Sequence, residues 1–232
     1  PNKREKKFIK IFDGTRAKYQ SRNEFMDKLS HNIIGYLEEW FEDNKNDIIR
    51  LDYPLGSTSV FFELGGFVGD YSSKIVDKFD TKAYIFEPKV DYFKELEKKF
   101  NGNKKINIYN LGLSDFNGTA YMDETGESSS IVTNKSKNLE KVEVVKLSTF
   151  INKENIEIID LININIEGSE YKVLNNLIDS KAISKIRSLQ IQFHKNIALS
   201  TWKRFRIHRR LSKTHKLIWN YNFVWERWDI KE

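Results

Sequence analysis

The sequence predicts an α/β fold built on a doubly wound parallel sheet. Two observations support this prediction. From about residue 60 onward, short apolar runs alternate with segments of helical spacing, and these runs are continuously apolar. Continuous apolar strands that alternate with helices are typical of a parallel sheet covered on both faces. The chain has 232 residues, which is long enough to bury a sizeable core.

The N-terminal part of the chain is expected to form a helical cap. Apolar residues recur at three- and four-residue steps from about Arg22 to Asp43, which predicts an amphipathic helix. The stretch Asp52–Gly56 contains a proline and a glycine, which typically interrupt helices and strands. We therefore expect a helical cap over residues 1–53 and a main domain over residues 54–232.

The main domain is expected to alternate strands with helices and to close with a hairpin. Strands are expected at Val60–Leu64, Ala83–Phe86, Ile106–Leu113, Gly118–Met122, Val142–Leu147, Ile156–Ile166 and Ile186–Phe193. Helices are expected at Gly69–Phe79, Val90–Phe100, Tyr171–Ile178 and Leu199–Leu211, and a polar surface loop at Asp123–Asn138. The alternating aromatic pattern of His215–Ile230 predicts a C-terminal β-hairpin.

The composition excludes several classes of protein. The absence of cysteine rules out disulfides, thiolate zinc sites, iron–sulfur clusters and cysteine nucleophiles. No apolar run approaches the ~20 residues that cross a bilayer, and no hydrophobic signal region is recognisable, so we expect a soluble, cytoplasmic protein. The net charge of +6 and the pI near 9.2 favour an anionic partner. The sequence leaves open whether the chain forms a homo-oligomer.

The first expected strand ends in Glu63 and runs into a glycine-rich turn that contains Gly65, Gly66 and Gly69. Glycines at this place allow a tight turn and let backbone N–H groups approach a ligand closely. The nicotinamide fingerprint G-x-G-x-x-G occurs nowhere in the chain, which argues against a nicotinamide oxidoreductase. The turn, together with Glu63 and the nearby Ser72, is a candidate cofactor site. A glycine-rich turn without a ligand is the alternative.

Polar residues also follow the second and third expected strands. Glu87 lies within the roughly 20-residue interval expected for an acid that accepts hydrogen bonds from ribose hydroxyls. A carboxylate suits that role because a diol presents two donors side by side. A solvated acid at a strand end is the alternative. Ser114 and Asp115 follow the third strand and are candidates for facing an adenine ring.

These segments resemble the FkbM family of S-adenosylmethionine-dependent O-methyltransferases. The motifs occur in one order, ending with Ile164-Asn165-Ile166-Glu167-Gly168-Ser169-Glu170, and the resemblance covers about Val60 to His194. It implies a Rossmann-like class I methyltransferase sheet, S-adenosylmethionine as cofactor, and a hydroxyl acceptor, often on a sugar or natural product. It also implies that the three turn glycines line the methionine portion of the cofactor, that Glu87 binds the ribose, and that Asp115 lies near the adenine.

Two departures from the family pattern concern the chemistry. The family usually has Lys-Ile-Asp-Val-Glu-Gly at the fourth strand, where this chain has Asn163 and Asn165 in place of the lysine and the aspartate. Phe67 replaces an asparagine that is common in the first motif of the family. These departures put in doubt any catalytic or metal role borrowed for the two asparagines. Asn165 with His194 is a poor ligand set for Mg²⁺, so no metal site is expected.

The chemical step needs a group that removes the proton of the acceptor. His194 follows the strand Ile186–Phe193, and its unperturbed pKa of roughly 6.5 suits a base near neutrality. The alternative is a hydrogen-bonded histidine at a strand end. Glu167 is a second candidate, either as base or as a holder of acceptor hydroxyls, and Asn165 in the same segment is a third. Glu170 is a candidate for binding the acceptor, against the alternative of a helix-start acid stabilised by the macrodipole.

A basic stretch from Lys195 to Lys216 contains no acidic residue. Within it, Arg206 and Arg209 are candidates for binding the diphosphate of a nucleotide-linked sugar, because arginine suits bidentate phosphate contacts. A solvated helix face is the alternative.

We therefore expect an S-adenosylmethionine-dependent O-methyltransferase that acts on a sugar hydroxyl. The resemblance places the acceptor, a nucleotide-linked sugar or a glycan, in bacterial capsule or surface polysaccharide biosynthesis. An RNA ribose 2′-O-methyltransferase is the alternative, motivated by the pI and by aromatic residues interleaved with basic ones, although we expect no nucleic-acid partner. A cofactor-binding module that has lost its chemistry is a further alternative, motivated by Asn163 and Asn165.

Overall fold

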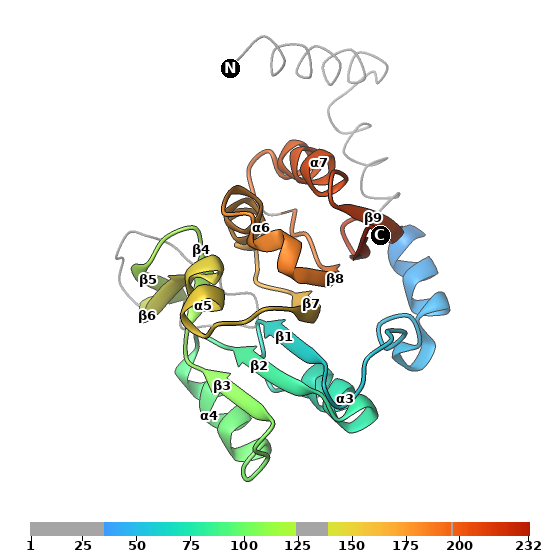
Figure 1. Ribbon diagram of the computed structural model, residues 1–232. Coiled ribbons are helices and arrows are strands. Elements are labelled where there is room, and N and C mark those ends of the chain that lie inside the picture. The colour runs from blue at the N-terminus through green and yellow to red at the C-terminus, as the bar shows by residue number, and fades with distance from the viewer. Residues whose placement is uncertain (1–34, 124–138, 196) are drawn as a thin grey trace, which may run out of the picture.

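The computed structural model describes residues 35–123, 139–195 and 197–232. Its centre is a seven-stranded sheet with the strand order β3-β2-β1-β7-β8-β10-β9 (Figure 1). The strands are β1 (Val60–Leu64), β2 (Lys82–Phe86), β3 (Ile106–Tyr109), β7 (Ile159–Ile164), β8 (Ile186–Ile191), β9 (His215–Tyr221) and β10 (Trp225–Ile230). The first five pair in parallel, and β10 is antiparallel to both of its neighbours. The predicted α/β fold is confirmed.

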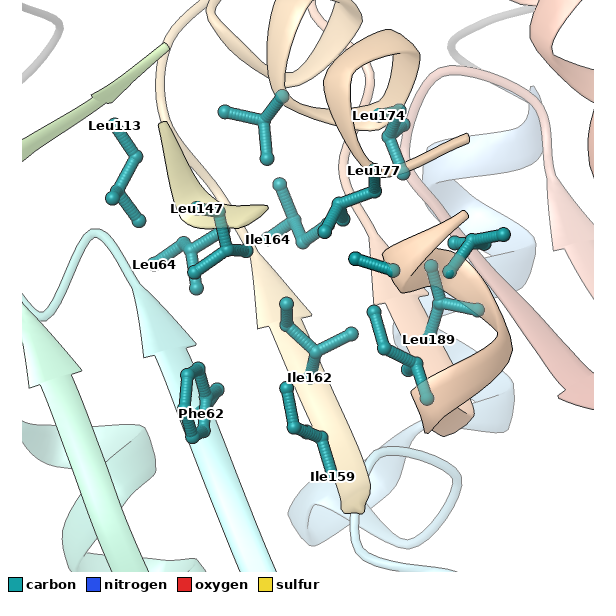
Figure 2. Close-up of a cluster of buried hydrophobic side chains, with 14 of the residues drawn as sticks. Phe62, Leu64, Leu113, Leu147, Ile159, Ile162, Ile164, Leu174, Leu177 and Leu189 are labelled. Carbon is teal, nitrogen blue, oxygen red and sulfur yellow. The ribbon is translucent and has the colours of Figure 1, made fainter. Parts of the chain in front are cut away.

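Helices cover both faces of this sheet. They are α3 (Asp70–Phe79) and α4 (Val90–Lys99) on one face, and α5 (Leu147–Lys153), α6 (Glu170–Asp179) and α7 (Ser200–Leu211) on the other. Phe62 and Leu64 of β1 belong to the larger core with Leu174 and Leu177 of α6 (Figure 2). Phe61 points the opposite way and joins a second core beneath α3 and α4. The two-residue period of a strand therefore sends alternate side chains of β1 into separate cores.

A second, three-stranded sheet with the order β4-β6-β5 lies beside the main one. Its strands are β4 (Gly112–Ser114), β5 (Gly118–Asp123) and β6 (Leu139–Lys146). The prediction of one strand over Ile106–Leu113 is wrong, because β3 ends at Tyr109 and β4 belongs to the other sheet. Asn110 explains the break, since its side-chain amide donates to the backbone oxygens of Glu87 and Pro88, at 2.9 Å each.

The strand predicted at Val142–Leu147 also ends differently. β6 stops at Lys146, and Leu147 begins α5, a helix that the sequence analysis did not predict. Leu147, Phe150 and Ile151 share the helical spacing and are all buried in the larger core. Of the polar loop predicted at Asp123–Asn138, residues 124–138 lie outside the described residues.

The start of the described chain packs on its end. Residues 35–43 are helical, and this blue helix lies next to the C-terminal strands in Figure 1. The ring of Trp40 lies 5.6 Å from that of Trp219 and 5.0 Å from that of Tyr221. The predicted hairpin is confirmed as β9–β10. Residues 22–34 of the predicted helix fall outside the described part, and the division at residue 53 stays a prediction. Among the described residues, no helix is long and apolar enough to span a membrane.

Candidate active site

A cavity of about 350 Å³ opens at the carboxyl ends of β1, β2 and β7, and Leu113 and Met122 of the small sheet complete its wall. Parallel α/β sheets bind ligands at this edge, because their strand-to-helix turns gather there. Four of the candidate site residues predicted from the sequence line the cavity: Gly65, Glu87, Asn165 and Glu167. The sequence therefore predicted the ends of three different strands that the fold brings together.

Gly65 allows the glycine turn to pass directly against the end of β7. Its φ is +87°, and a Cβ added to it would lie 2.1 Å from the backbone oxygen of Asn165. The other two turn glycines serve packing behind the turn. A Cβ at Gly66 would meet Ile85 at 2.4 Å, and one at Gly69 would meet Leu96 at 2.7 Å. Gly66 and Gly69, which the resemblance placed along the cofactor, thus face β2 and α4 and are not among the cavity-lining residues.

The Glu87 carboxylate lies in the cavity wall, where a ribose-binding acid is expected. Its Oε2 accepts a hydrogen bond from the backbone N–H of Phe67 at 2.9 Å, and its Oε1 accepts one from that of Lys89 at 2.9 Å. Burial raises the pKa of Glu87, and these two donors oppose that rise. Each carboxylate oxygen has a second lone pair. Glu87 can therefore hold the glycine turn and still accept hydrogen bonds from ligand hydroxyls.

Ser114 and Asp115, expected to face an adenine ring, lie at the end of β4 and outside the cavity lining. Ser114 is buried and donates to Asp115 at 3.2 Å, and Asp115 is exposed. Leu111 and Gly112, together with Leu113, line the cavity in their place. The break between β3 and β4 moves this segment relative to the position expected for one continuous strand.

Glu63 and Ser72 lie beneath the glycine turn and not in the cavity lining. The Ser72 hydroxyl donates to Glu63, and the Asn163 amide nitrogen lies 3.4 Å from the other carboxylate oxygen. Burial raises the pKa of Glu63 to about 8, against the opposing charge of Arg50. Asn163, which departs from the family pattern, thus has a buried structural partner.

Asn165 brings an unsatisfied acceptor to the cavity. Its Oδ1 is buried and has no hydrogen-bond partner among the described residues, although the residue lines the cavity. Buried polar atoms are nearly always paired in folded proteins. The orphaned oxygen of Asn165 therefore fits a bound ligand that donates a hydrogen bond.

Glu167, His194 and Glu170 form a cluster where β7 and β8 end. His194 Nε2 lies 3.0 Å from Glu167 Oε1, and His194 Nδ1 lies 3.4 Å from Glu170 Oε1. The backbone of His194 is fixed too, because its N–H donates to Glu170 at 2.8 Å and its carbonyl accepts from the Tyr171 hydroxyl at 2.8 Å. Glu170 is fully buried and also accepts from the Gly168 N–H at 2.7 Å. Within this cluster, only Glu167 lines the cavity.

The pKa of His194 is raised to about 9. Burial lowers this pKa, but the close contact with Glu167 and the negative charges of Glu167 and Glu170 outweigh the effect of burial. His194 is therefore a cation at neutral pH. Because a protonated imidazole cannot accept a proton, the raised pKa of His194 and the position of Glu167 in the cavity wall favour Glu167 as the proton acceptor.

We expect the free energy of unfolding to fall as the pH rises from 6.5 to about 9. The pKa values of Glu63 and His194 are raised in the folded chain, from 4.5 to about 8 and from 6.5 to about 9. Between each pair of values the folded state binds more protons than the unfolded state, so raising the pH costs stability. Urea unfolding at a series of pH values checks this. H194Q should flatten the decline above pH 8, and an unaltered decline would contradict the raised pKa of His194.

The sequence analysis missed an aromatic pair in the cavity wall. The rings of Phe67 and Tyr92 lie 4.5 Å apart, edge to face, and both residues line the cavity. Phe67 has a φ of +46° and Glu167 a φ of +49°, values that are rare for residues with a side chain. Such backbone strain clusters at ligand sites. Lys89 and Gln192 also line the cavity, and their positions just after β2 and β8 were the signal that could have identified them.

The structure does not bring Arg206 and Arg209 to the cavity. Both are exposed on α7, and Arg206 lies over the Trp202 ring at 4.7 Å. Arg204 and Arg210 of the same helix form ion pairs with Glu226 and Asp179. Phosphate binding by Arg206 and Arg209 stays a prediction.

Solved structures resemble this chain to different degrees. A protein from Clostridium thermocellum assigned as an rRNA methylase superimposes with a TM-score of 0.52 at 8% identity, over 85% of this chain and 96% of its own. Fibrillarin, a pre-rRNA processing protein from Methanococcus jannaschii, gives a TM-score of 0.47 at 11% identity, over 76% of this chain and 68% of its own. No curated protein matches the chain. At such low identity the likeness shows the fold alone, which is that of a Rossmann-like class I methyltransferase.

The chain belongs to the FkbM methyltransferase family, because a family model described as the methyltransferase FkbM domain matches residues 63–219. Family and fold together support an S-adenosylmethionine-dependent methyltransferase and imply that cofactor. The cavity fits it on three observations: close backbone approach at Gly65, a carboxylate at Glu87 for ribose hydroxyls, and the orphaned acceptor of Asn165.

Proposed function

We propose that this methyltransferase methylates a sugar hydroxyl, on a nucleotide-linked sugar or a glycan of bacterial capsule or surface polysaccharide biosynthesis. One observation carries the proposal of O-methylation: the Glu167 carboxylate lies in the cavity wall and is held 3.0 Å from the charged ring of His194. A hydroxyl becomes an effective nucleophile when a positioned group takes its proton. The sugar acceptor is supported by the family resemblance.

The chain has three tasks in this reaction: to bind, to orient and to take a proton. S-adenosylmethionine supplies, when bound, a sulfonium methyl that is already activated for displacement. We assign Gly65, Glu87 and Asn165 to holding this cofactor. Glu167 takes the proton of the acceptor hydroxyl onto its carboxylate, and His194 orients that carboxylate through Nε2. Glu170 and Tyr171 contribute indirectly, because their hydrogen bonds hold the backbone of His194 in place.

The proposal is tested by mass spectrometry with isotope-labelled S-adenosylmethionine and a panel of nucleotide sugars and glycans. We expect the labelled methyl group on a sugar hydroxyl. A parallel reaction with RNA tests the alternative acceptor, and label on RNA with none on any sugar would overturn the sugar assignment. Binding of S-adenosylhomocysteine without label transfer to any acceptor would favour a module that has lost its chemistry.

A further inference from the structure

A row of polar side chains crosses the main sheet directly beneath the cavity. Glu63, Asn163 and Gln190 are register neighbours on β1, β7 and β8, and all three are buried. Asn163 Nδ2 lies 3.4 Å from Glu63 Oε1, and Gln190 Nε2 donates to Asn163 Oδ1 at 2.8 Å. These three residues are named the polar row below.

The polar row supports the cavity from the same face of the sheet. Residues two positions apart along a strand share a face, and the residues two positions after the members of the row are Gly65, Asn165 and Gln192. All three line the cavity. Ser72 donates to Glu63 and so ties the row to the first turn of α3. A displacement of the row would therefore be transmitted to the cavity wall at three strand ends.

Residues 44–53, which precede the sheet in the chain, cover the polar row. Tyr53 is buried, and its hydroxyl donates to Gln190 Oε1 at 3.1 Å. The Arg50 guanidinium lies between two rings, 4.0 Å from that of Tyr71 and 4.3 Å from that of Trp225. With the Gln190 amide turned over, its oxygen accepts from Arg50 Nε at 3.0 Å. Gln190 contacts Tyr53 in either orientation, whereas its hydrogen bond to Asn163 belongs to the first orientation and its contact with Arg50 to the second.

Further contacts hold the segment in place. Asn44 Oδ1 accepts a hydrogen bond from the backbone N–H of Arg50 at 3.1 Å. On β10, Arg227 donates to the backbone oxygen of Asp52 at 2.6 Å and lies over the Tyr53 ring at 4.2 Å. Residues 44–53 precede residues 63–219, which match the family model. The segment therefore packs on the sheet but does not belong to the region that matches the family model.

We propose that Tyr53 and Arg50 are positioning residues for the methyl-donor cavity and that they act through the polar row. This inference rests on the proposed cofactor site. Tyr53 contacts the buried amide of Gln190, and Arg50 lies beside that amide between the rings of Tyr71 and Trp225. Residues 44–53 thus support the cavity through the polar row, although neither Tyr53 nor Arg50 lines the cavity.

The test is the affinity of Y53F for S-adenosylhomocysteine, measured by calorimetry at a temperature where every variant is fully folded. Losing the Tyr53 hydrogen bond should weaken binding by about three- to tenfold. Y221F is the matched control. The Tyr221 hydroxyl donates to Asp43 at 2.6 Å and so holds the helix of residues 35–43, but it makes no contact with the polar row. Y221F should bind with the wild-type affinity, even where its melting temperature falls as much as that of Y53F.

Two results would overturn this inference and leave the proposed function standing. One is an unchanged affinity in Y53F while the wild-type chain binds, and the other is an equal loss of affinity in Y53F and Y221F, which would indicate general loosening of the segment. A wild-type chain that binds no S-adenosylhomocysteine would overturn the proposed function together with the inference.

Discussion

Replacing Glu167 with glutamine should lower kcat for methyl transfer by about 10²- to 10⁴-fold, the usual contribution of a positioned acid or base. E167Q keeps the shape of the side chain and an oxygen facing His194, but an amide cannot take the proton of the acceptor. The affinity for S-adenosylhomocysteine should stay within about twofold, because binding the cofactor needs no proton transfer. Steady-state kinetics on the acceptor found in the labelling screen, together with calorimetry, measures both quantities.

The comparison with H194Q separates the two candidate bases. Because His194 is protonated at neutral pH and orients Glu167, H194Q should lower kcat less than E167Q does. A larger loss in H194Q than in E167Q would assign the proton to His194 instead. Wild-type kcat in E167Q would remove Glu167 from the chemical step altogether.

Replacing Gly65 with alanine should abolish binding of S-adenosylhomocysteine and destabilise the fold. A left-handed backbone costs a residue with a side chain about 1–3 kcal/mol. The new methyl group would also lie 2.1 Å from the backbone oxygen of Asn165, so the turn and the end of β7 must move apart. Overpacking of this kind adds about 1–3 kcal/mol. Calorimetry and urea unfolding report the two effects separately.

G102A is the matched control for that variant. Gly102 has a φ of +82°, close to that of Gly65, but a Cβ added there would have no atom within 4 Å. Both variants carry the backbone strain, and only G65A carries the clash at the cavity. G102A should therefore lose some stability and keep its affinity for S-adenosylhomocysteine. Equal affinities of G65A and G102A would contradict the placement of the cofactor against Gly65.

The sequence predicted the main sheet well because each of its strands has a local signal. Val60–Leu64 is a short apolar run followed by glycines, and its bounds are those of β1. The prediction of one strand over Ile106–Leu113 was wrong because the side chain of Asn110 donates to the connection after β2, which lies more than 20 residues away in the sequence. The prediction that Leu147 ends a strand was wrong because a single sequence does not distinguish an apolar residue that ends a strand from one that begins a helix.

The candidate site was predictable at the strand ends and not beyond them. Glu87 and Glu167 follow strands that end at the same edge of the sheet, and the interval before Glu87 together with the family resemblance around Glu167 indicated a shared site. The state of His194 was not predictable, because its pKa depends on two carboxylates that only the fold brings to the imidazole. Glu63 also lies at a strand end, but its side chain is buried beneath the turn and outside the cavity lining, a placement that depends on the fold.

The central claim is that a methyl group passes from S-adenosylmethionine to the oxygen of a sugar hydroxyl at this cavity. The most direct measurement is the position of an isotope-labelled methyl group in the product, determined by NMR for the wild-type chain and for E167Q. We predict a labelled O-methyl signal on a sugar carbon with the wild-type chain, and loss of that signal with E167Q. A label on nitrogen or phosphate, or an O-methyl product that E167Q forms at the wild-type rate, would contradict the claim.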